Sequence, residues 1–204
     1  MESKKPESKK QEPAIFQNEE RAKASIELLK FIYSNVNDQT KFAESKNGAL
    51  IILNSGLIFG YLSILPYEPN NCPLIIFIYS IIFVFFNVVA IFISLLSLIP
   101  ILSKIPQTEK PDDGTLNILF FDHLTGFSEK ELVRRTNHDL NIQESDYDDP
   151  ICLQLAQQII VNSGITKRKY CLFKKALWST IFGLFTPIIG VIILFIVDRK
   201  QRGK

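Results

Sequence analysis

The chain has 204 residues, of which 47% are hydrophobic, and its formal net charge is +2 at pH 7. Residues 1–47 hold nine Lys or Arg and eight Asp or Glu, residues 103–175 hold ten and eleven, and little charge lies elsewhere except at the C-terminal end. This distribution argues against a nucleic-acid partner, because no basic face stands free of acidic residues, and against a single globular domain. It is typical of a membrane protein with soluble segments.

The N-terminal region divides into a tail and a helix. Residues 1–20 mix Lys, Glu, Ser and Pro with few apolar groups, so we predict a disordered tail that buries too little surface to offset its ordering entropy. Residues 21–47 are predicted to form an amphipathic cytoplasmic helix that either packs on a partner, which we favour, or lies on lipid. Its apolar side chains recur at intervals of three and four, namely Ala22, Ile26, Leu29, Tyr33 and Val36.

A transmembrane hairpin is predicted over residues 48–102. Its first span, residues 48–65, carries no charge and just reaches the roughly 17–25 residues that a spanning helix needs. A short turn rich in Pro and Asn follows and leads straight back into the membrane. The second span, residues 74–102, has no charged residue and is longer than a bilayer requires, so we expect it to tilt or project.

Three residues of the hairpin bear on how its helices pack. Gly56 and Gly60 match the small-xxx-small pattern, which allows helices in a membrane to approach closely. Asn87 is the one strongly polar side chain in the middle of the second span. It either donates a hydrogen bond to a neighbouring helix or lines a polar path, and we expect the first.

Residues 103–175 are predicted to form a mostly helical cytoplasmic segment between the second and third spans. The apolar run LNILFF within it is a buried strand or the start of a helix, because periodicity cannot decide over six residues. Ser128 and Glu131 have the spacing of a capping box, which predicts a helix through about Asn137. A second long helix begins near Pro150, with a mostly apolar face comprising Leu153, Gln157, Ile160 or Val161, Gly164 and Ile165.

The third predicted span covers residues 176–197, with Trp178 near its entry and a kink expected at Pro187. Basic residues flank the spans on one side and are absent from the turn between the first two, so the N-terminus and the 103–175 segment are expected in the cytoplasm. A full third span places the basic tail, residues 198–204, outside. The alternative is a re-entrant segment that returns to the inner face, and we favour the full span.

The sequence offers little for catalysis. Asp122 and His123 invite an acid–base interpretation, but a general base needs a nucleophile or metal beside it, and His138 is the one other histidine. No HExxH, GxSxG or phosphate-binding glycine loop occurs, and the three cysteines form no CxxC pair. We therefore expect no enzyme, no cofactor and no metal site, and we expect Asp122 and His123 to begin a turn or helix.

A ligand site is easier to argue. Amide side chains can recognise the edge of a nucleobase, and Arg or Lys can bind a phosphate. Gln158 and Asn162 share a helix face just before a basic cluster, although the amides can equally bond to the 117–135 segment and the cations to anionic lipid heads. The candidate ligand-binding residues are Asn117, Asp122, His123, Gln158, Asn162, Arg168 and Lys169.

Four stretches, in order, resemble the membrane-spanning effector proteins of bacterial Pycsar antiphage systems. They are a helix leading to ESKNGALIILNSG, an apolar run ending near a proline, NILFFDHLTGFSEKEL, and QQIIVNSGITKRKYCLFKKAL before a last apolar run. The resemblance implies that a companion cyclase makes a cyclic pyrimidine mononucleotide, cyclic UMP or cyclic CMP, on infection. The effector then impairs the bacterial inner membrane and stops growth before the phage matures. No catalytic residues come with the family, which often has a small residue such as glycine where this chain has Asp122.

The prediction is thus an all-α integral membrane protein with three transmembrane helices and a mostly helical cytoplasmic segment between spans two and three. Lipid bilayer and cyclic nucleotide are its expected partners, and a homo-oligomer is expected because three short spans alone make a poor pore. A ligand that prefers one arrangement of the cytoplasmic segment would shift the packing of the spans. The alternatives are a membrane-anchored scaffold and a small ion channel unrelated to defence.

Overall fold

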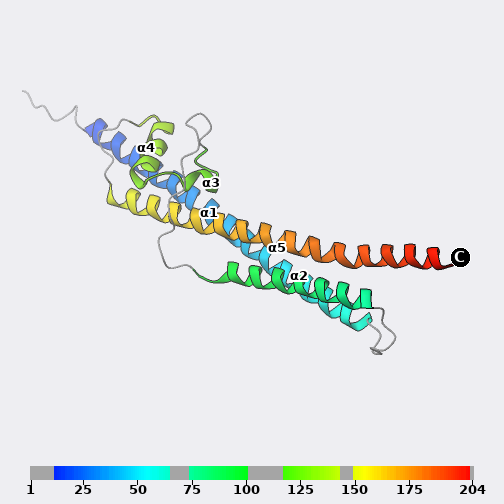
Figure 1. Ribbon diagram of the computed structural model, residues 1–204. Helices are drawn as coiled ribbons and strands as arrows, with labels where there is room; N and C mark the ends of the chain where they lie inside the picture. The colour runs from blue at the N-terminus through cyan, green and yellow to red at the C-terminus, as the bar shows by residue number, and fades with distance from the viewer. Residues whose placement is uncertain (1–11, 65–73, 101–116, 143–148, 203–204) are drawn as a thin grey trace, which may run out of the picture. The chain divides into compact units, whose positions relative to one another are not determined.

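The computed structural model describes residues 12–64, 74–100, 117–142 and 149–202. Its elements are five helices, shown in Figure 1. They are α1 (Glu12–Ile64), α2 (Leu74–Leu98), α3 (Phe121–Leu124), α4 (Glu129–Asp139) and α5 (Pro150–Arg202). The described residues contain no strand, so the predicted all-helical fold is confirmed.

The helices form two compact units. Unit 1 comprises Met1–Thr40 and Ser103–Lys167, and unit 2 comprises Lys41–Leu102 and Arg168–Lys204. The helices α3 and α4 belong to unit 1 and α2 belongs to unit 2, whereas α1 and α5 each contribute to both. The long helices therefore have one packing environment in their unit 1 portions and another in their unit 2 portions.

Unit 1 has an apolar core between the long helices and the short ones. The core residues come from α1, from α5, from α4, and from α3 with the turn that follows it. They are Leu29, Ile32, Val36, Leu124, Phe127, Leu132, Val133, Cys152, Ala156 and Ile159. Removal of such side chains from water is the main favourable contribution to folding of this unit, since each fully buried Leu or Ile contributes about 1.5–3 kcal/mol.

The predicted apolar face of α1 is confirmed at Leu29 and Val36, which are fully buried. On α5 the buried face lies one position before the predicted one, because Gln157 is exposed while Ala156 is fully buried. The α5 residues in the core of unit 1 are Cys152, Ala156 and Ile159, and the predicted Leu153 and Ile160 pack against this core while partly buried.

The short helices of unit 1 follow their local sequence signals. Ser128 caps α4, its hydroxyl accepting from the Glu131 backbone N–H at 3.4 Å while the Glu131 carboxylate accepts from the Ser128 N–H at 2.9 Å. The predicted capping box is thus confirmed. Described residues of the apolar run before Asp122 form a turn that leads into α3, so the choice between strand and helix resolves as helix.

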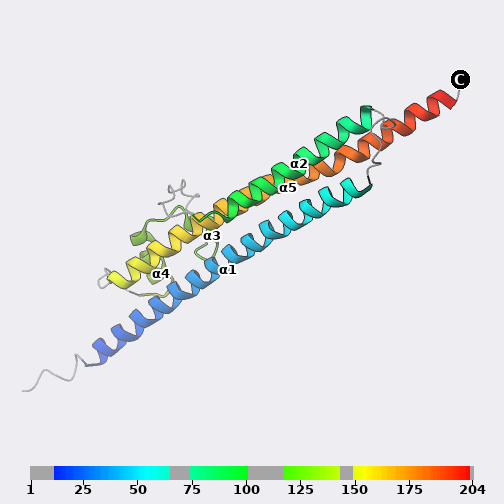
Figure 2. The same cartoon turned by 90° about the horizontal axis from the view of Figure 1, so that it is seen from below.

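Unit 2 is a bundle of α2 with the second half of α1 and the second half of α5, visible in Figures 1 and 2. Asn54 of α1 contacts Thr180 of α5, and Tyr61, near the end of α1, contacts Ser80, near the start of α2. These pairs make α1 and α5 parallel and α2 antiparallel to both. All three helices are long and apolar enough to cross a membrane.

The boundaries of the long helices differ from the predicted ones. The helix α1 begins at Glu12, inside the predicted disordered tail, and runs without a break through the amphipathic helix and the first span. The helix α5 joins the predicted soluble helix to the third span and continues through Pro187 to Arg202. The helix α1 continues through Asn47-Gly48, a pair that often marks a turn, and neighbouring helices compensate for a proline in a helix such as α5. Residues 1–11, 65–73, 101–116, 143–148 and 203–204 lie outside the described residues, and with them most of the predicted tail and the predicted turn between the first two spans.

Candidate functional site

Asn117 and His123 lie together in the turn that leads into α3. The Asn117 backbone N–H donates to His123 Nδ1 at 3.1 Å, and the Asn117 side-chain oxygen accepts from the Leu119 N–H at 2.8 Å. Because a backbone N–H can only donate, His123 Nδ1 acts as the acceptor and carries no proton in this bond. His123 therefore stabilises a turn, and the prediction that Asp122 and His123 begin a turn or helix is confirmed by α3.

Asp122, on α3, forms an ion pair with Lys167 of α5. Asp122 Oδ1 lies 2.6 Å from Lys167 Nζ, and the two side chains are 42% and 39% exposed. On the other side, Asn35 of α1 donates from Nδ2 to the Leu119 carbonyl at 2.9 Å. Residues 117–126, here called the α3 strap, are thus tied to both long helices by polar contacts, and the paired Asp122 Oδ1 is buried although its side chain is partly exposed.

Two further polar pairs join α1 to α5 within unit 1. Asn162 Nδ2 donates to Asn37 Oδ1 at 3.0 Å, and the hydroxyls of Thr40 and Thr166 share a short hydrogen bond. Gln158, four residues before Asn162, is exposed and takes no part in these pairs. The structure therefore brings Asn162 into the helix contact and leaves Gln158 on the surface.

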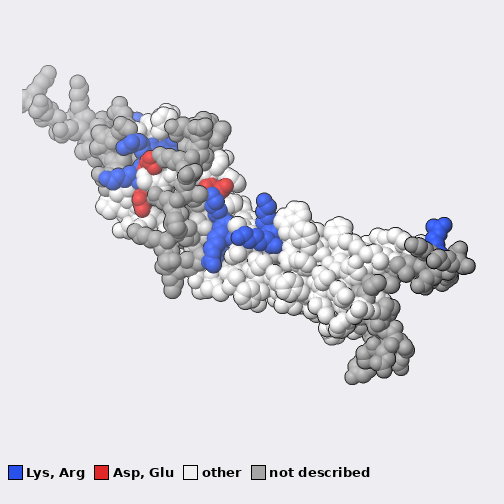
Figure 3. All heavy atoms as spheres, in the orientation of Figure 1, with Lys and Arg blue, Asp and Glu red and all other residues white. Residues whose placement is uncertain are grey.

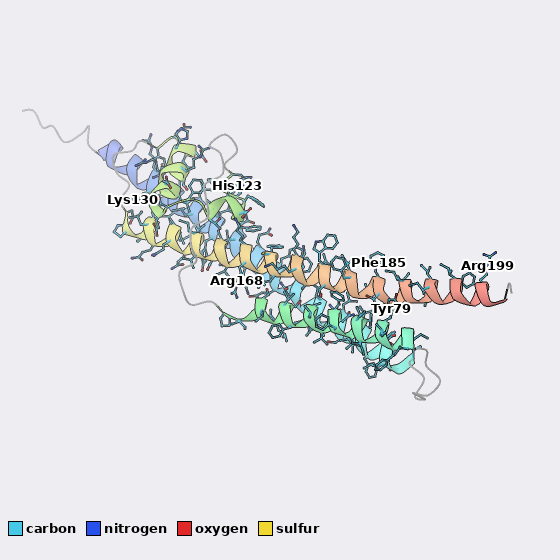
Figure 4. The ribbon with its side chains drawn as sticks, in the orientation of Figure 1. Tyr79, His123, Lys130, Arg168, Phe185 and Arg199 are labelled. Carbon is cyan, nitrogen blue, oxygen red and sulfur yellow. The ribbon has the colours of Figure 1, made fainter. Side chains whose placement is uncertain are left out.

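Arg168 and Lys169, the two predicted phosphate ligands, belong to unit 2. Arg168 is exposed (Figure 4), whereas Lys169 is only 8% exposed and its Nζ forms an ion pair with Glu44 of α1. The Lys169 carbonyl also accepts a hydrogen bond from Asn47 at 3.4 Å. Lys169 thus holds α5 to α1, and its charge is already compensated.

Lys46, a further basic residue of unit 2, stands beside aromatic rings. Lys46 Nζ lies 4.3 Å from the centre of the Phe42 ring and 5.5 Å from the rings of Tyr170 and Phe173. Figure 3 shows the basic side chains of unit 2 gathered at one end of its uncharged surface and again at the end of α5. A belt of cations and aromatic rings at one end of an apolar bundle is typical of a membrane interface.

The interior of unit 2 holds many polar side chains beside buried apolar ones such as Leu50 and Phe83, and Asn87 is the one that the sequence singled out as a packing residue. The buried polar side chains are Asn47, Asn54, Ser80, Asn87, Ser94, Ser97, Lys169, Ser179, Thr180 and Thr186. The outer surface of the same helices carries large apolar side chains, including Ile81, Val88, Leu95 and Phe185, the last of which Figure 4 shows on the side of α5 away from α2. Large apolar side chains on the outside and polar ones between the helices are what is expected where lipid replaces water.

Several of these polar groups bond across the bundle. The Asn54 amide and the Thr180 hydroxyl contact each other at 3.0 and 3.1 Å, and the Tyr61 and Ser80 hydroxyls lie 2.6 Å apart. Ser179 donates to the Phe86 carbonyl at 2.8 Å. These bonds link α5 to α1, α1 to α2 and α5 to α2.

Asn87 does not make the predicted interhelical hydrogen bond. Its Nδ2 donates to the Phe83 carbonyl of its own helix at 2.7 Å, and no partner for its Oδ1 exists among the described residues. It nevertheless packs against α5, because a Cβ added at Gly183 would lie 2.8 Å from Asn87 Nδ2. The close-packed glycines are Gly183 and Gly190, whereas nothing lies within 4 Å of a Cβ at Gly56 or Gly60.

One signal in the sequence could have identified the polar interior. Asn47, Asn54 and Tyr61 are spaced by seven residues, and so are Ser80, Asn87 and Ser94. A seven-residue period keeps one face of a helix against its neighbours in a left-handed bundle. Polar residues at this spacing in an apolar run therefore mark the interior face.

A family model described as a Pycsar effector protein domain matches residues 28–197. No curated protein and no solved structure matches the chain. The matched range includes both units, from the first core residues of α1 to the end of the third apolar segment. The match is to a transmembrane effector and not to a known enzyme family.

Proposed function

The chain belongs to the Pycsar effector proteins, which are membrane-spanning effectors of antiphage defence activated by a cyclic pyrimidine nucleotide, and we propose how that signal reaches the membrane. The nucleotide, cyclic UMP or cyclic CMP, binds to unit 1. Binding changes the packing of the long helices in unit 1. Unit 2 then lets ions cross the membrane. Loss of the membrane potential stops growth of the infected cell.

The observation that carries this proposal is the continuity of α1 and α5. Each helix contributes to an apolar core in unit 1 and to a polar interior in unit 2. Because each of these helices is unbroken, a rotation or separation of the helices in unit 1 is transmitted along them into unit 2. A ligand with different affinities for two arrangements of unit 1 therefore shifts the population of two arrangements of unit 2.

The α3 strap is the proposed nucleotide-sensing element. Lys167 is the basic partner of Asp122, and a cyclic phosphate carries one negative charge that can replace the Asp122 carboxylate at Lys167. Asn117, His123 and the Asn37–Asn162 pair supply donors and acceptors for a base and a ribose. Exchange of Asp122 for the nucleotide releases the strap from α5, and α1 and α5 are then free to repack.

Unit 1 is proposed to face the cytoplasm of a bacterial cell, with unit 2 in the inner membrane. The exposed cations Arg168, Lys174 and Lys175 follow unit 1 along α5 and suit the inner membrane face. The unbroken course of α5 through Pro187 favours a full third span over a re-entrant one. A homo-oligomer is proposed for the active state, because three helices enclose too little space for a pore.

Growth and membrane potential in bacteria test this function directly. Cells that express the protein should lose potential only when cyclic UMP or cyclic CMP is supplied, and growth should stop. A potential and growth rate unchanged by either nucleotide would contradict the proposal. A scaffold would instead return one stoichiometric partner in a pull-down without any loss of potential, and an ordinary channel would conduct without nucleotide.

Two variants test the strap. Lys167→Gln should weaken nucleotide binding and raise the nucleotide concentration needed for loss of potential, while Lys130→Gln, which removes an exposed lysine of α4, should leave both unchanged. Asp122→Asn should lower the nucleotide requirement, because the strap is then held less firmly to α5. Equal behaviour of the Lys167 and Lys130 variants would rule out the strap as the sensor.

A further inference from the structure

Four buried polar atoms in the interior of unit 2 lack a hydrogen-bond partner within the described part of the chain. They are Asn47 Oδ1, Asn87 Oδ1, Ser94 Oγ and Ser97 Oγ. An unpaired polar group inside a bundle costs about 1–3 kcal/mol, so these groups oppose the packing in which they stand. The three-helix packing seen in the structure, here called the closed bundle, would be more stable with alanine in place of Ser94 or Ser97. The packing of the closed bundle therefore does not explain why these four polar groups are present.

These unpaired groups belong to the row of buried polar side chains in the interior of unit 2 given above, here called the polar seam. The polar seam is nearly as long as a membrane is thick. On α2 the seam runs from Ser80 through Asn87 and Ser94 to Ser97, which at 1.5 Å per residue spans about 25 Å. The hydrocarbon core of a bilayer is about 30 Å thick. Phe83 and Ala90 are buried on the same face between these residues, whereas residues one position further along α2, such as Val88 and Leu95, are exposed and apolar. The polar groups of α2 that can bind water therefore lie on the seam face.

The helix α2 is also the least firmly held of the three. The described side-chain hydrogen bonds that join it to its neighbours are those of Ser80 and of the Phe86 carbonyl, whereas α1 and α5 share the Asn54–Thr180 bonds and the Glu44–Lys169 ion pair. Against α5 it packs through Asn87 at Gly183, Tyr79 at Gly190 and the Phe86 ring beside Phe182, none of which is a hydrogen bond. Figure 4 labels Tyr79 on α2. Separation of α2 from α5 would expose the seam with few bonds broken.

We propose that, in the active homo-oligomer, the polar seam of each unit 2 lines a water-filled path through the membrane once α2 has separated from α5. This inference rests on the proposed function and identifies the residues that carry it out. Water then supplies the hydrogen bonds that Asn87, Ser94 and Ser97 lack in the closed bundle. The described seam residues beyond the Lys169–Glu44 pair are uncharged, so the path passes small ions of either sign and dissipates the potential without strong selectivity.

Thiol labelling of single-cysteine variants tests the lining. In protein whose three natural cysteines are replaced by alanine, Ser94→Cys places a thiol in the seam and Leu95→Cys places one on the lipid face. A charged methanethiosulfonate reagent reacts with thiols in water and not in lipid. In proteoliposomes, labelling at position 94 should rise severalfold when cyclic UMP or cyclic CMP is added, and labelling at position 95 should stay low.

A measurement of the membrane potential in the same proteoliposomes distinguishes failure of the proposed function from failure of the seam model. If nucleotide causes no loss of potential, the proposed function fails and the seam model falls with it. If nucleotide does cause loss of potential while Ser94→Cys labels no faster than Leu95→Cys, the ions cross elsewhere. That second result overturns the seam model and leaves the proposed function intact.

A second pair of variants tests whether the unpaired hydroxyls serve the open state. The double variant Ser94→Ala/Ser97→Ala removes two groups that cost energy in the closed bundle and bind water in the open one. The nucleotide-triggered leak should fall about tenfold or more, because tenfold corresponds to only 1.4 kcal/mol, and the melting temperature should not fall. An unchanged leak, or a lower melting temperature with an unchanged leak, would assign the hydroxyls a packing role and overturn the inference.

Discussion

Asn54 of α1 and Thr180 of α5 hydrogen-bond to each other inside unit 2, with the Asn54 Nδ2 and Oδ1 atoms 3.0 and 3.1 Å from the Thr180 hydroxyl. Both residues are almost fully buried, at 0% and 2% exposure. Each side chain also bonds to a carbonyl of its own helix, at Leu50 and at Ala176. The pair therefore fixes the register of α1 against α5 in the middle of the apolar segments, where no water competes.

Thr180→Val tests the strength of this contact with little change of shape. Loss of the hydroxyl leaves the Asn54 amide without its interhelical partner and should cost about 0.6–1.7 kcal/mol, the range measured for such bonds in membranes. The measurement is the free energy of unfolding in detergent. Ser63→Ala is the control, since the exposed Ser63 bonds only to the Phe59 carbonyl of its own helix. Equal stability of the two variants would mean that the pair contributes nothing to bundle packing.

In the Lys169–Glu44 ion pair, Lys169 is buried and Glu44 is half exposed, and the stability of variants should reflect this difference. Glu44→Gln leaves the 8%-exposed Lys169 without its counter-charge, whereas the Glu44 side chain is itself half exposed, so the destabilisation should stay below the roughly 3–5 kcal/mol of a fully buried pair. The double variant Glu44→Gln/Lys169→Met should recover part of that loss in the same unfolding measurement. Lys174→Met, at an exposed position on the same helix, should change stability by less than about 0.5 kcal/mol. A double variant no more stable than Glu44→Gln would show that the charge is not what destabilises the single variant.

Cys152 should make the stability of unit 1 depend on pH in the alkaline range. Burial raises the pKa of its thiol above the ordinary value of 9.0, and the nearby Asp149 carboxylate raises it further. The folded protein therefore keeps a proton that the unfolded chain releases near pH 9, so stability should fall as the pH rises through about 9. Melting temperatures at pH 7 and at pH 10 measure the effect.

The alkaline loss should be smaller in Cys152→Ala, because the thiol is gone, than in Cys171→Ala, which removes an exposed thiol of the same helix. All other titrating groups are common to the two variants and cancel in this comparison. The same alkaline loss in both variants would place its cause outside Cys152.

The sequence predicted most of the fold because the relevant signals are local. Uncharged runs indicated the spans, and Ser128 with Glu131 indicated the start of α4. Asn87 was correctly placed in a span, but its bonding partner was not predictable, because the close approach of Gly183 depends on which helix lies opposite. The ion pair of Asp122 with Lys167 was not predictable for the same reason, because it joins residues 45 positions apart.

Gly183 packs closely against α2, whereas Gly56 has open space beside it. Ala at position 183 would place its Cβ 2.8 Å from Asn87 Nδ2 and 3.3 Å from Phe86 Cβ, so the Asn87 side chain must shift and α2 must give way slightly at Phe86. Such overpacking typically costs about 1–3 kcal/mol in a closed bundle, and the cost falls on the contact whose opening exposes the polar seam. Gly183→Ala should therefore lower the melting temperature and produce loss of membrane potential at a lower nucleotide concentration than the unmodified protein needs. Nothing lies within 4 Å of a Cβ at Gly56, so Gly56→Ala should leave the closed bundle unchanged. If Gly183→Ala instead raises the nucleotide requirement, separation of α2 from α5 is not the step that opens the membrane.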